Sequence, residues 1–323
     1  MAVKSIGVLT GGGDAPGMNA CLRAVTRAAL ASGLRVLGIR RAYEGMTLGE
    51  FCELGPRDVG GIIQRGGTFL KTARFPQFAD IEVQRRALVQ LKTHGAGALV
   101  AIGGDGTMRG ALALHKLGFP VVGIPASIDN DVYGTDISIG VDTALNTIIE
   151  AIDKLRDTAS SHQRAFLVET MGRHCGHLAL MSGIISGAEM TLIPEQDVEP
   201  EEVAAAVREA YARGKTHAIV VVSEGAKYPA VKLKRKLDEL KLDVDLRVTI
   251  LGHVQRGGAP SAWDRLIAAR FGVNAVERLI AGESGVMVGL RSREVVGVPL
   301  EESGSRQREP DMEFYRMGRM LAQ

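Results

Sequence analysis

The sequence has little of what marks secreted, membrane or nucleic-acid-binding proteins. It has three cysteines, Cys21, Cys52 and Cys175, an odd number without a CxxC pair. With no signal-peptide pattern, they predict free thiols in a reducing cytoplasm. No apolar run approaches the ~20 residues of a membrane span. The formal net charge is only +2, without a basic block. We therefore expect a cytoplasmic protein with no membrane and no nucleic-acid partner.

What the sequence does have is an alternation of short apolar runs with longer helical patterns. Its 323 residues are 46% hydrophobic and 24% charged, an ordinary globular composition. The apolar runs predict strands at 5–10, 35–40, 97–104, 119–125, 164–170, 189–195, 217–225, 245–252 and 285–300. The helical patterns lie at 18–33, 108–118, 142–161, 176–187, 200–214, 233–242, 261–282 and 308–321. This alternation is typical of βαβ units and parallel sheets.

The strands are too many for one sheet, which sets the predicted fold. We expect an α/β protein of two doubly wound domains, with mostly parallel sheets, helices on both faces and the active site in the cleft between them. The helix over 142–161 is the best candidate for a crossing between the domains. The stretch 308–321 predicts a capped helix packed on the second domain.

The first strand runs into a glycine-rich loop, "TGGGDAPGMN" (10–19). Glycine lets the backbone approach a ligand closely, and the start of the following helix favours phosphate. The loop is not a P-loop, because Met18-Asn19 replaces Lys-Ser/Thr, and not a Rossmann fingerprint, because Pro16 stands where the third glycine belongs. It indicates a phosphate site; a tight turn with Asp14 as a helix cap is the alternative.

A second glycine-rich loop, "IGGDGTMRG" (102–110), follows another strand and carries Asp105. Three glycines allow the main chain to wrap a polyphosphate, and a carboxylate is suited to Mg²⁺. Asp105 or Thr107 as a plain N-cap is the alternative. Because one cap does not need three glycines, we favour a nucleotide site.

The stretch "SIDND" (127–131) places Asp129 and Asp131 at the end of a buried strand. If this segment is extended, residues two apart point the same way, so both carboxylates would face one crevice. Paired acids suit a metal-bearing polyphosphate or a base that faces a hydroxyl. An Asx-turn built on Asn130 and one Asp is the alternative.

Several basic residues lie near later strand ends. They would form an anion pocket if they converge, since Arg matches phosphate geometry. They are Arg164, Arg173, Arg247, His253 and Arg256.

Seven motifs in this order make the chain similar to the phosphofructokinase family over nearly its whole length. They are "IGVLTGGGDAPGMNA", "RGGTFLKTARFP", "IGGDGT", "SIDNDVYGTDISIGVDTALN", "LRDTASSHQR", "ETMGRHCGHLAL" and "VTILGHVQRGGAPSAWDR". The resemblance implies transfer of the ATP γ-phosphoryl group to the 1-hydroxyl of fructose 6-phosphate, a step of glycolysis. It also implies a nucleotide (ATP/Mg) domain of residues 1–138 plus 251–303, and a sugar-phosphate domain of residues 139–250 plus 304–323.

The resemblance also supplies roles for individual residues. Asp129 matches the general base, Arg173 a side chain that stabilises the transferring group, and Ser127 a hydroxyl that contacts it. Asp105 matches a Mg²⁺ ligand, and Asp131 is expected to support the metal through water. The nucleotide site is implied at Gly12, Arg74, Phe75, Gly104, Asp105, Gly106 and Thr107. The sugar phosphate is implied to bind at Ser127, Asp129, Arg164, Met171, Gly172, Arg173, Glu224, Arg247, His253 and Arg256.

Arg164 and Arg247 match residues that reach in from a neighbouring subunit, which implies an oligomer, usually a homotetramer. The phosphoryl donor is expected to be ATP. Pyrophosphate-dependent members typically carry Asp in place of Gly106 and Lys in place of Ala126. An Asp at 106 would set a negative charge against the α-phosphate, at a cost of about 3 kcal/mol.

The positions that match an allosteric effector site in bacterial members are less complete. They are Arg23, Arg27, Arg156, Glu189, Arg213, Lys215 and His217. Pro56 stands where an effector-binding Arg would align, with Arg57 one place off, and Thr216 stands where Lys is common. We therefore expect a weakened or altered effector response.

Other functions are weighed against this one. A pyrophosphate-dependent enzyme and a catalytically inactive paralogue that senses nucleotides or sugar phosphates are the main alternatives. NAD and lipid kinases share the "GGDGT" loop but lack the other motifs.

Overall fold

The computed structural model describes residues 3–308 and 311–322, which form two compact units. Unit 1 contains the residues up to Ser127, Asp131–Thr143 and Arg256–Arg308. Unit 2 contains Ile128–Asn130, Ala144–Gln255 and the described residues after Arg308. The long helix predicted over 142–161 is α5 (Val141–His162), and the division between the units passes through its first turn. The predicted two doubly wound α/β units are confirmed.

Unit 1 is built on a seven-stranded sheet in the order β11-β10-β5-β4-β1-β2-β3. β2/β3 and β10/β11 pair antiparallel, and the other neighbours pair parallel. The strands are β1 (Ser5–Thr10), β2 (Arg35–Ile39), β3 (Phe51–Glu53), β4 (Ala98–Gly103), β5 (Val121–Pro125), β10 (Val286–Arg291) and β11 (Glu294–Pro299). β1, β4 and β5 are buried along their full length. Such continuous apolar strands are typical of a parallel sheet covered on both faces.

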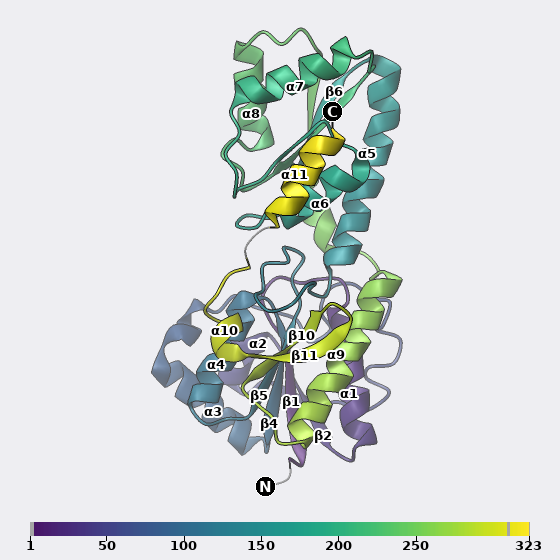
Figure 1. Cartoon of the computed structure of the whole chain (residues 1–323). Coiled ribbons are helices and arrows are strands. Elements are labelled where there is room, and N and C mark those ends of the chain that lie inside the picture. Colours follow the sequence, from purple (N-terminus) through teal and green to yellow (C-terminus); the bar gives the residue numbers. More distant parts are fainter. Residues whose placement is uncertain (1–2, 309–310, 323) are drawn as a thin grey trace. The chain divides into compact units, whose positions relative to one another are not determined.

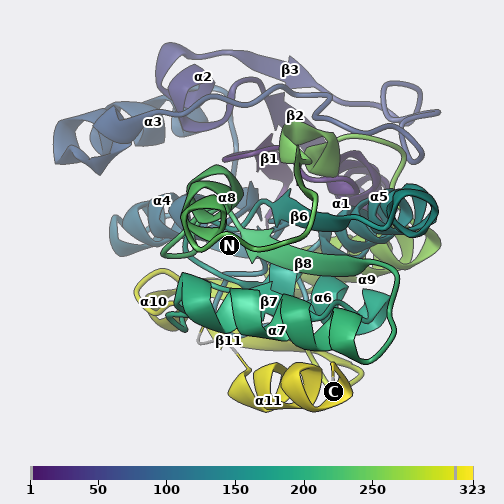
Figure 2. The ribbon, with the colours of Figure 1, turned by 90° about the horizontal axis from the view of Figure 1, so that it is seen from above.

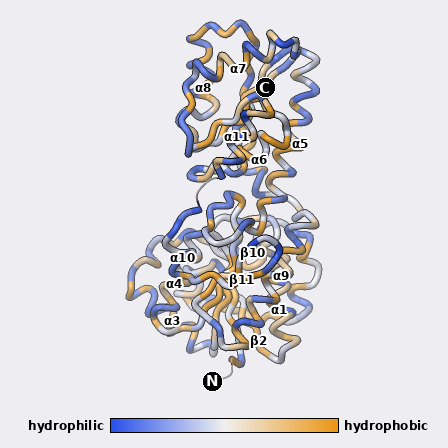
Figure 3. Tube along the Cα trace, in the orientation of Figure 1, coloured by the Kyte–Doolittle hydropathy of each residue, from blue (hydrophilic) through white to orange (hydrophobic). Residues whose placement is uncertain are grey.

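Helices cover both faces of this sheet (Figure 1). α1 and α9 pack together on one face, and α3 and α4 lie on the other. The helices of unit 1 are α1 (Met18–Ala31), α2 (Ala42–Leu48), η1 (Pro76–Ala79), α3 (Ile81–Thr93), α4 (Asp105–Lys116), α9 (Ala262–Ile280) and α10 (Leu300–Ser303). Hydrophobic stretches gather on the sheet, and hydrophilic ones lie on the outer turns (Figure 3).

Unit 2 holds a four-stranded parallel sheet in the order β7-β8-β6-β9. Its elements are β6 (Ala165–Thr170), α6 (His177–Ser186), β7 (Met190–Leu192), α7 (Pro200–Ala212), β8 (Ala218–Ser223), α8 (Ala230–Glu239), β9 (Leu246–Ile250), η2 (Gly252–Arg256, whose last residue belongs to unit 1) and α11 (Met312–Leu321). α7 starts with a capping box between Glu199 and Glu202, with Pro200 in the first turn. α11, at the lower edge of Figure 2, packs against α6 and β7.

One predicted strand differs in detail from the structure, and the predicted C-terminal cap is confirmed. The run 285–300 is a hairpin rather than one strand, because Ser292 adopts a left-handed conformation (φ 59°) and turns the chain between β10 and β11. The C-terminal helix is capped as expected, since the Asp311 side chain accepts a 3.0 Å hydrogen bond from Glu313 N. No described helix is long and apolar enough to cross a membrane.

Candidate active site

The two glycine-rich loops meet at the point where the strand order of unit 1 reverses. The chain passes from β1 to β2 on one side and returns to β4 on the other, so loops 11–17 and 104–107 leave neighbouring strands at the same sheet edge. Ligands of open α/β sheets bind at such points. Side chains would not fit there: a Cβ at Gly11 or Gly103 would lie 2.8 or 2.3 Å from Thr107 Oγ1.

A cavity of about 560 Å³ opens beside these loops. Its lining includes five of the seven residues predicted to bind nucleotide, namely Gly12, Arg74, Phe75, Gly106 and Thr107. Loop 65–75 reaches the cavity because it is tied to the first glycine-rich loop. Thr72 Oγ1 donates a 2.8 Å hydrogen bond to Gly12 O, and Asn19 accepts one of 2.7 Å from Phe69 N. Residues from three separate sequence motifs therefore share one cavity.

Tyr43 is a lining residue that the sequence reasoning missed. Its hydroxyl donates a 2.7 Å hydrogen bond to Thr107 O, and its ring stacks on Phe78 with 4.2 Å between centroids. Gly110 leaves room for the ring, since a Cβ there would lie 2.4 Å from it. Burial raises the pKa of Tyr43, so its hydroxyl stays protonated. Tyr43 thus forms an aromatic wall of the cavity and supports the loop that carries Thr107.

The expectation that "SIDND" is extended is wrong. Residues 128 and 129 form a turn, and Asn130 is left-handed with φ 53°. The alternation of a strand therefore does not apply to Asp129 and Asp131. Instead, Ser127 Oγ donates a 2.9 Å hydrogen bond to Asp131 Oδ1 across the base of the turn. Asp129 lies within the turn and is partly buried.

Asp105 and Asp131 are close enough to influence each other. Burial raises the pKa of Asp131, and the negative charge of Asp105 acts in the same direction, while the hydrogen bond from Ser127 opposes both. Asp105 Oδ2 also forms a 2.6 Å ion pair with Arg109. In the described part of the chain, no group of three or more His, Cys, Asp or Glu could hold a metal. Two carboxylates nevertheless fit Mg²⁺, which commonly binds one or two carboxylates plus water and substrate phosphate.

Asp264 is a second residue that the sequence reasoning missed. It is fully buried at the start of α9. Its carboxylate accepts 2.8 Å hydrogen bonds from Gly140 N and Thr143 N, and a further one from the Thr143 hydroxyl. Ile139, the residue before Gly140, pairs with the end of β5, because Ser127 N donates a 3.1 Å hydrogen bond to Ile139 O. Asp264 therefore fixes the end of the loop that begins with Ser127.

In unit 2, a group of predicted residues lies at the carboxyl edge of the small sheet. Ser223 Oγ donates a 2.6 Å hydrogen bond to Gly172 O, and buried Gln255 accepts one of 3.2 Å from Met171 N. A Cβ at Gly225 would lie 2.0 Å from Arg173 O, so the two loops touch through their backbones. These contacts gather the ends of β6, β8 and β9, which carry Met171, Gly172, Arg173, Glu224 and His253.

Arg164 and Arg247 lie at the opposite edge of the same sheet. They stand at the starts of neighbouring strands β6 and β9 and converge on Asp245, with ion-pair distances of 2.6 and 3.0 Å. The hydrogen bond from Arg247, together with the one from Arg164, holds the pKa of Asp245 below its usual range. β6 has six residues, so it separates the two edges by roughly 17 Å. Within one chain, these two arginines do not converge with His253.

Arg256 lies in unit 1, beside the first glycine-rich loop. Its Nη1 would be 2.9 Å from a Cβ at Gly13, so the guanidinium packs closely on this loop. The buried Nε has no hydrogen-bond partner among the described residues. A partly buried guanidinium whose buried Nε donor is unused is suited to an anion.

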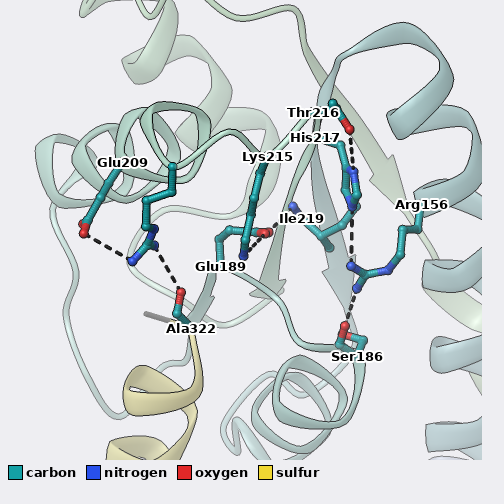
Figure 4. Close-up of polar contacts among 10 residues, drawn as sticks. Arg156, Ser186, Glu189, Glu209, Lys215, Thr216, His217, Ile219 and Ala322 are labelled. Atoms are coloured by element: carbon teal, nitrogen blue, oxygen red, sulfur yellow. Dashed lines mark hydrogen bonds and ion pairs between the residues drawn. The ribbon is translucent and has the colours of Figure 1, made fainter.

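The effector-type residues of unit 2 form a polar cluster on another part of the unit (Figure 4). Buried Glu189 accepts from Lys215 over 3.0 Å and from Ile219 N over 2.5 Å. Arg156 contacts His217 over 3.5 Å. Burial lowers the pKa of His217, and the charge of Arg156 acts in the same direction. These residues therefore lie together, whereas Arg23 and Arg27 belong to α1 of unit 1.

Comparison with known proteins identifies the family of the chain. The family described as Phosphofructokinase matches residues 5–279. ATP-dependent 6-phosphofructokinase 1 of Thermus thermophilus is 53% identical over 323 residues, covering 99% of this chain and 100% of the relative. ATP-dependent 6-phosphofructokinase of Bacillus thuringiensis is 49% identical, with the same coverage of both chains. The solved phosphofructokinase of Saccharomyces cerevisiae has a TM-score of 0.88 and 37% identity, over 93% of this chain and 45% of the yeast chain. The chain belongs to the phosphofructokinase family.

Proposed function

We propose that the chain is an ATP-dependent 6-phosphofructokinase, which phosphorylates the 1-hydroxyl of fructose 6-phosphate to give fructose 1,6-bisphosphate and ADP. The observation that carries the proposal is the identity of about half of all residues, along the whole chain, to proteins of that name. The cavity at the switch point of unit 1 and the carboxylates beside it supply the site that such chemistry needs.

In this proposal the transferred group is handled by three side chains. Asp129 accepts the proton of the sugar hydroxyl, the Ser127 hydroxyl contacts the phosphoryl group, and Arg173 stabilises its charge. The transition state is loose, so positioning and charge stabilisation matter more than bond-making by the protein. The turn that holds Ser127 and Asp131 together supports such positioning.

The nucleotide binds against the two glycine-rich loops, with Gly104, Gly106 and Thr107 on its phosphates and Arg74 and Phe75 at the cavity wall. Asp105 and Asp131 would hold Mg²⁺, which would supply positive charge to the phosphate oxygens. Gly106 supports ATP as donor because it leaves the phosphate path free of negative charge. Ala126, only 1% exposed, offers no ammonium group in place of nucleotide contacts.

The sugar phosphate binds through Met171, Gly172, Glu224, His253 and Arg256. Its 6-phosphate is also bound by Arg164 and Arg247 of a neighbouring subunit. The separation of these two arginines from His253 within one chain supports this division. We therefore propose a homotetramer with shared sites, which works in the cytoplasm.

The test is phosphoryl transfer to fructose 6-phosphate with Mg²⁺, with ATP and pyrophosphate offered in parallel. We expect turnover with ATP and none with pyrophosphate. Turnover with pyrophosphate alone would overturn the argument from Gly106 and Ala126. If neither donor reacts while both ligands bind, the chain is a sensing paralogue and not an enzyme.

A further inference from the structure

The segment 300–308 joins the two elements that carry the carboxylates Asp105 and Asp131. At one end, α10 packs on α4, the helix that starts with Asp105. At the other end, residues 306–308, here called the strap, lie along loop 131–136. The segment 300–308, the helix α4 and loop 131–136 all belong to unit 1. We propose that Arg308 is a positioning residue that fixes the loop beginning at Asp131 relative to the helix beginning at Asp105.

Arg308 binds the loop through its backbone and its side chain. Its amide donates a 3.3 Å hydrogen bond to Asp131 O. Its guanidinium Nη1 donates to Asp136 O over 2.6 Å and to Thr135 O over 3.3 Å. One residue earlier, Gln307 forms an antiparallel bridge with Val132, which is fully buried. Hydrogen bonds from a charged donor are stronger than neutral ones, so Arg308 is the firmest of these ties.

The other end of the segment is held by apolar packing. Leu300 is fully buried and meets Met108 of α4 at Gly123, where a Cβ would lie 2.5 Å from the Met108 sulfur and 3.3 Å from Leu300. Gly304 also lies close to α4, since a Cβ there would be 3.4 Å from the side chain of Leu112. Because this end is packed into the core, the strap is a fixed support for the loop.

The opposite side of the loop is held by the β10–β11 hairpin. Leu290 N donates to Thr135 Oγ1 over 3.0 Å, and Asp136 N donates to Leu290 O over 2.7 Å. The loop therefore lies between the hairpin and the strap, and Arg308 supplies side-chain donors on the strap side. Phosphoryl transfer depends on placement to a fraction of an ångström. Loss of the Arg308 guanidinium would remove the side-chain donors that hold Thr135 and Asp136 on the strap side, and so reduce turnover.

The experiment compares three variants with the unchanged enzyme. Arg308→Met keeps the apolar stem and removes the donors, while Arg308→Lys keeps the charge and places its donors on a single nitrogen. Arg306→Ala is the matched control, because it removes a guanidinium of the same strap whose 3.2 Å partner is the Tyr133 hydroxyl and not a loop carbonyl. Hydrogen exchange of peptides covering 131–136 is measured without substrates, and kcat and KM are measured with ATP, Mg²⁺ and fructose 6-phosphate.

We expect at least tenfold faster exchange in 131–136 for Arg308→Met, with β1 and β6 unchanged. We also expect kcat at least tenfold lower and both KM values changed less than threefold. Arg308→Lys should restore most of both properties, and Arg306→Ala should match the unchanged enzyme. Unchanged exchange in Arg308→Met, faster exchange throughout unit 1, or faster exchange confined to 131–136 with normal kcat would each overturn the inference.

The kinetic part rests on the proposed function, and the exchange part does not. If the unchanged enzyme shows no turnover, the proposed function fails, and the exchange of 131–136 still decides whether Arg308 anchors the loop. If the unchanged enzyme is active and Arg308→Met equals it, the inference fails and the function stands.

Discussion

Among single residues, Asp129 carries the most specific chemical role in the proposal. Replacing it by Ser removes the base but leaves the loops around it in place. A general base contributes roughly 10²–10⁴-fold, so we expect kcat of Asp129→Ser to fall by about that factor. Binding of fructose 6-phosphate, measured by calorimetry, should change little.

A matched control for this substitution is Asp136→Ser, which removes a carboxylate of the same loop that is exposed and accepts a 2.6 Å hydrogen bond from Ser292 N. It should retain most of its turnover. An Asp129→Ser enzyme with normal kcat would show that another group takes the proton.

The residues that the sequence could indicate share a local reason. Glycine-rich loops and carboxylates at strand ends can be recognised from a few neighbouring positions in the sequence. Tyr43, Asp264 and Arg308 could not be found this way. Their partners lie 64, 121–124 and up to 177 positions away along the chain. Only the folded topology brings such pairs together, and nothing in the residues around them records it.

At the scale of elements, one carboxylate holds the start of two helices. Asp264 lies in the first turn of α9, where Ser261 is the N-cap. It accepts from Gly140 N, just before α5, and from Thr143 N in the first turn of α5. Asp264→Ala would leave two amides and a hydroxyl without their acceptor in a buried place. Each unsatisfied group costs about 1–3 kcal/mol, so we expect a loss of about 3 kcal/mol in the free energy of unfolding. Urea unfolding at pH 7 measures it.

The control is Asp142→Ala, which removes the neighbouring and partly exposed carboxylate. It should lower the free energy of unfolding by less than about 1 kcal/mol.

The pH dependence of stability tests whether burial of the Asp264 carboxylate has the expected effect. Burial raises the pKa of Asp264 above its ordinary value of 3.8, although its hydrogen bonds oppose this. The native state then binds the proton more readily, so stability relative to Asp264→Ala should fall as pH rises from 3.8 through the raised pKa. A stability gain with rising pH in that window would contradict the direction.

Elements with strong periodicity were predictable from sequence, and short or turned ones were not. The alternation of buried strands and helices indicated the two sheets, because a parallel strand buried on both faces is apolar along its length. The turn at 128–130 was considered only as the alternative to an extended segment, because the left-handed Asn130 and the Ser127–Asp131 hydrogen bond that closes the turn become visible only in the fold. The three-residue strand β3 pairs only along one edge of β2 and is too short for a pattern to appear.

At the scale of the whole molecule, the proposal requires active sites completed by two chains. Asp129→Ser and Arg164→Ala should each be nearly inactive when prepared alone. Mixed and reassembled in equal amounts, they should recover activity, because some sites combine an intact Asp129 from one chain with an intact Arg164 from its neighbour. Random mixing in a symmetric oligomer restores about a quarter of the sites. Coupled assays before and after reassembly measure the recovery.

The control mixes each variant with itself under the same conditions, which should restore nothing. Recovery by the unlike pair alone supports sharing. An absence of recovery, with hybrid oligomers demonstrated by native mass spectrometry, would show that Arg164 serves its own chain. The edge-to-edge separation on the small sheet argues against that result.

The interleaving of the two units also bears on how the chain is made. Unit 1 begins the sequence, but its sheet lacks β10 and β11 until residue 299 has been synthesised. The four strands of unit 2 are complete at residue 250. On the ribosome, the inserted unit can therefore form its sheet while the unit that started first still waits for its last strands. We expect the unfinished amino-terminal half to be the part most in need of chaperones during synthesis.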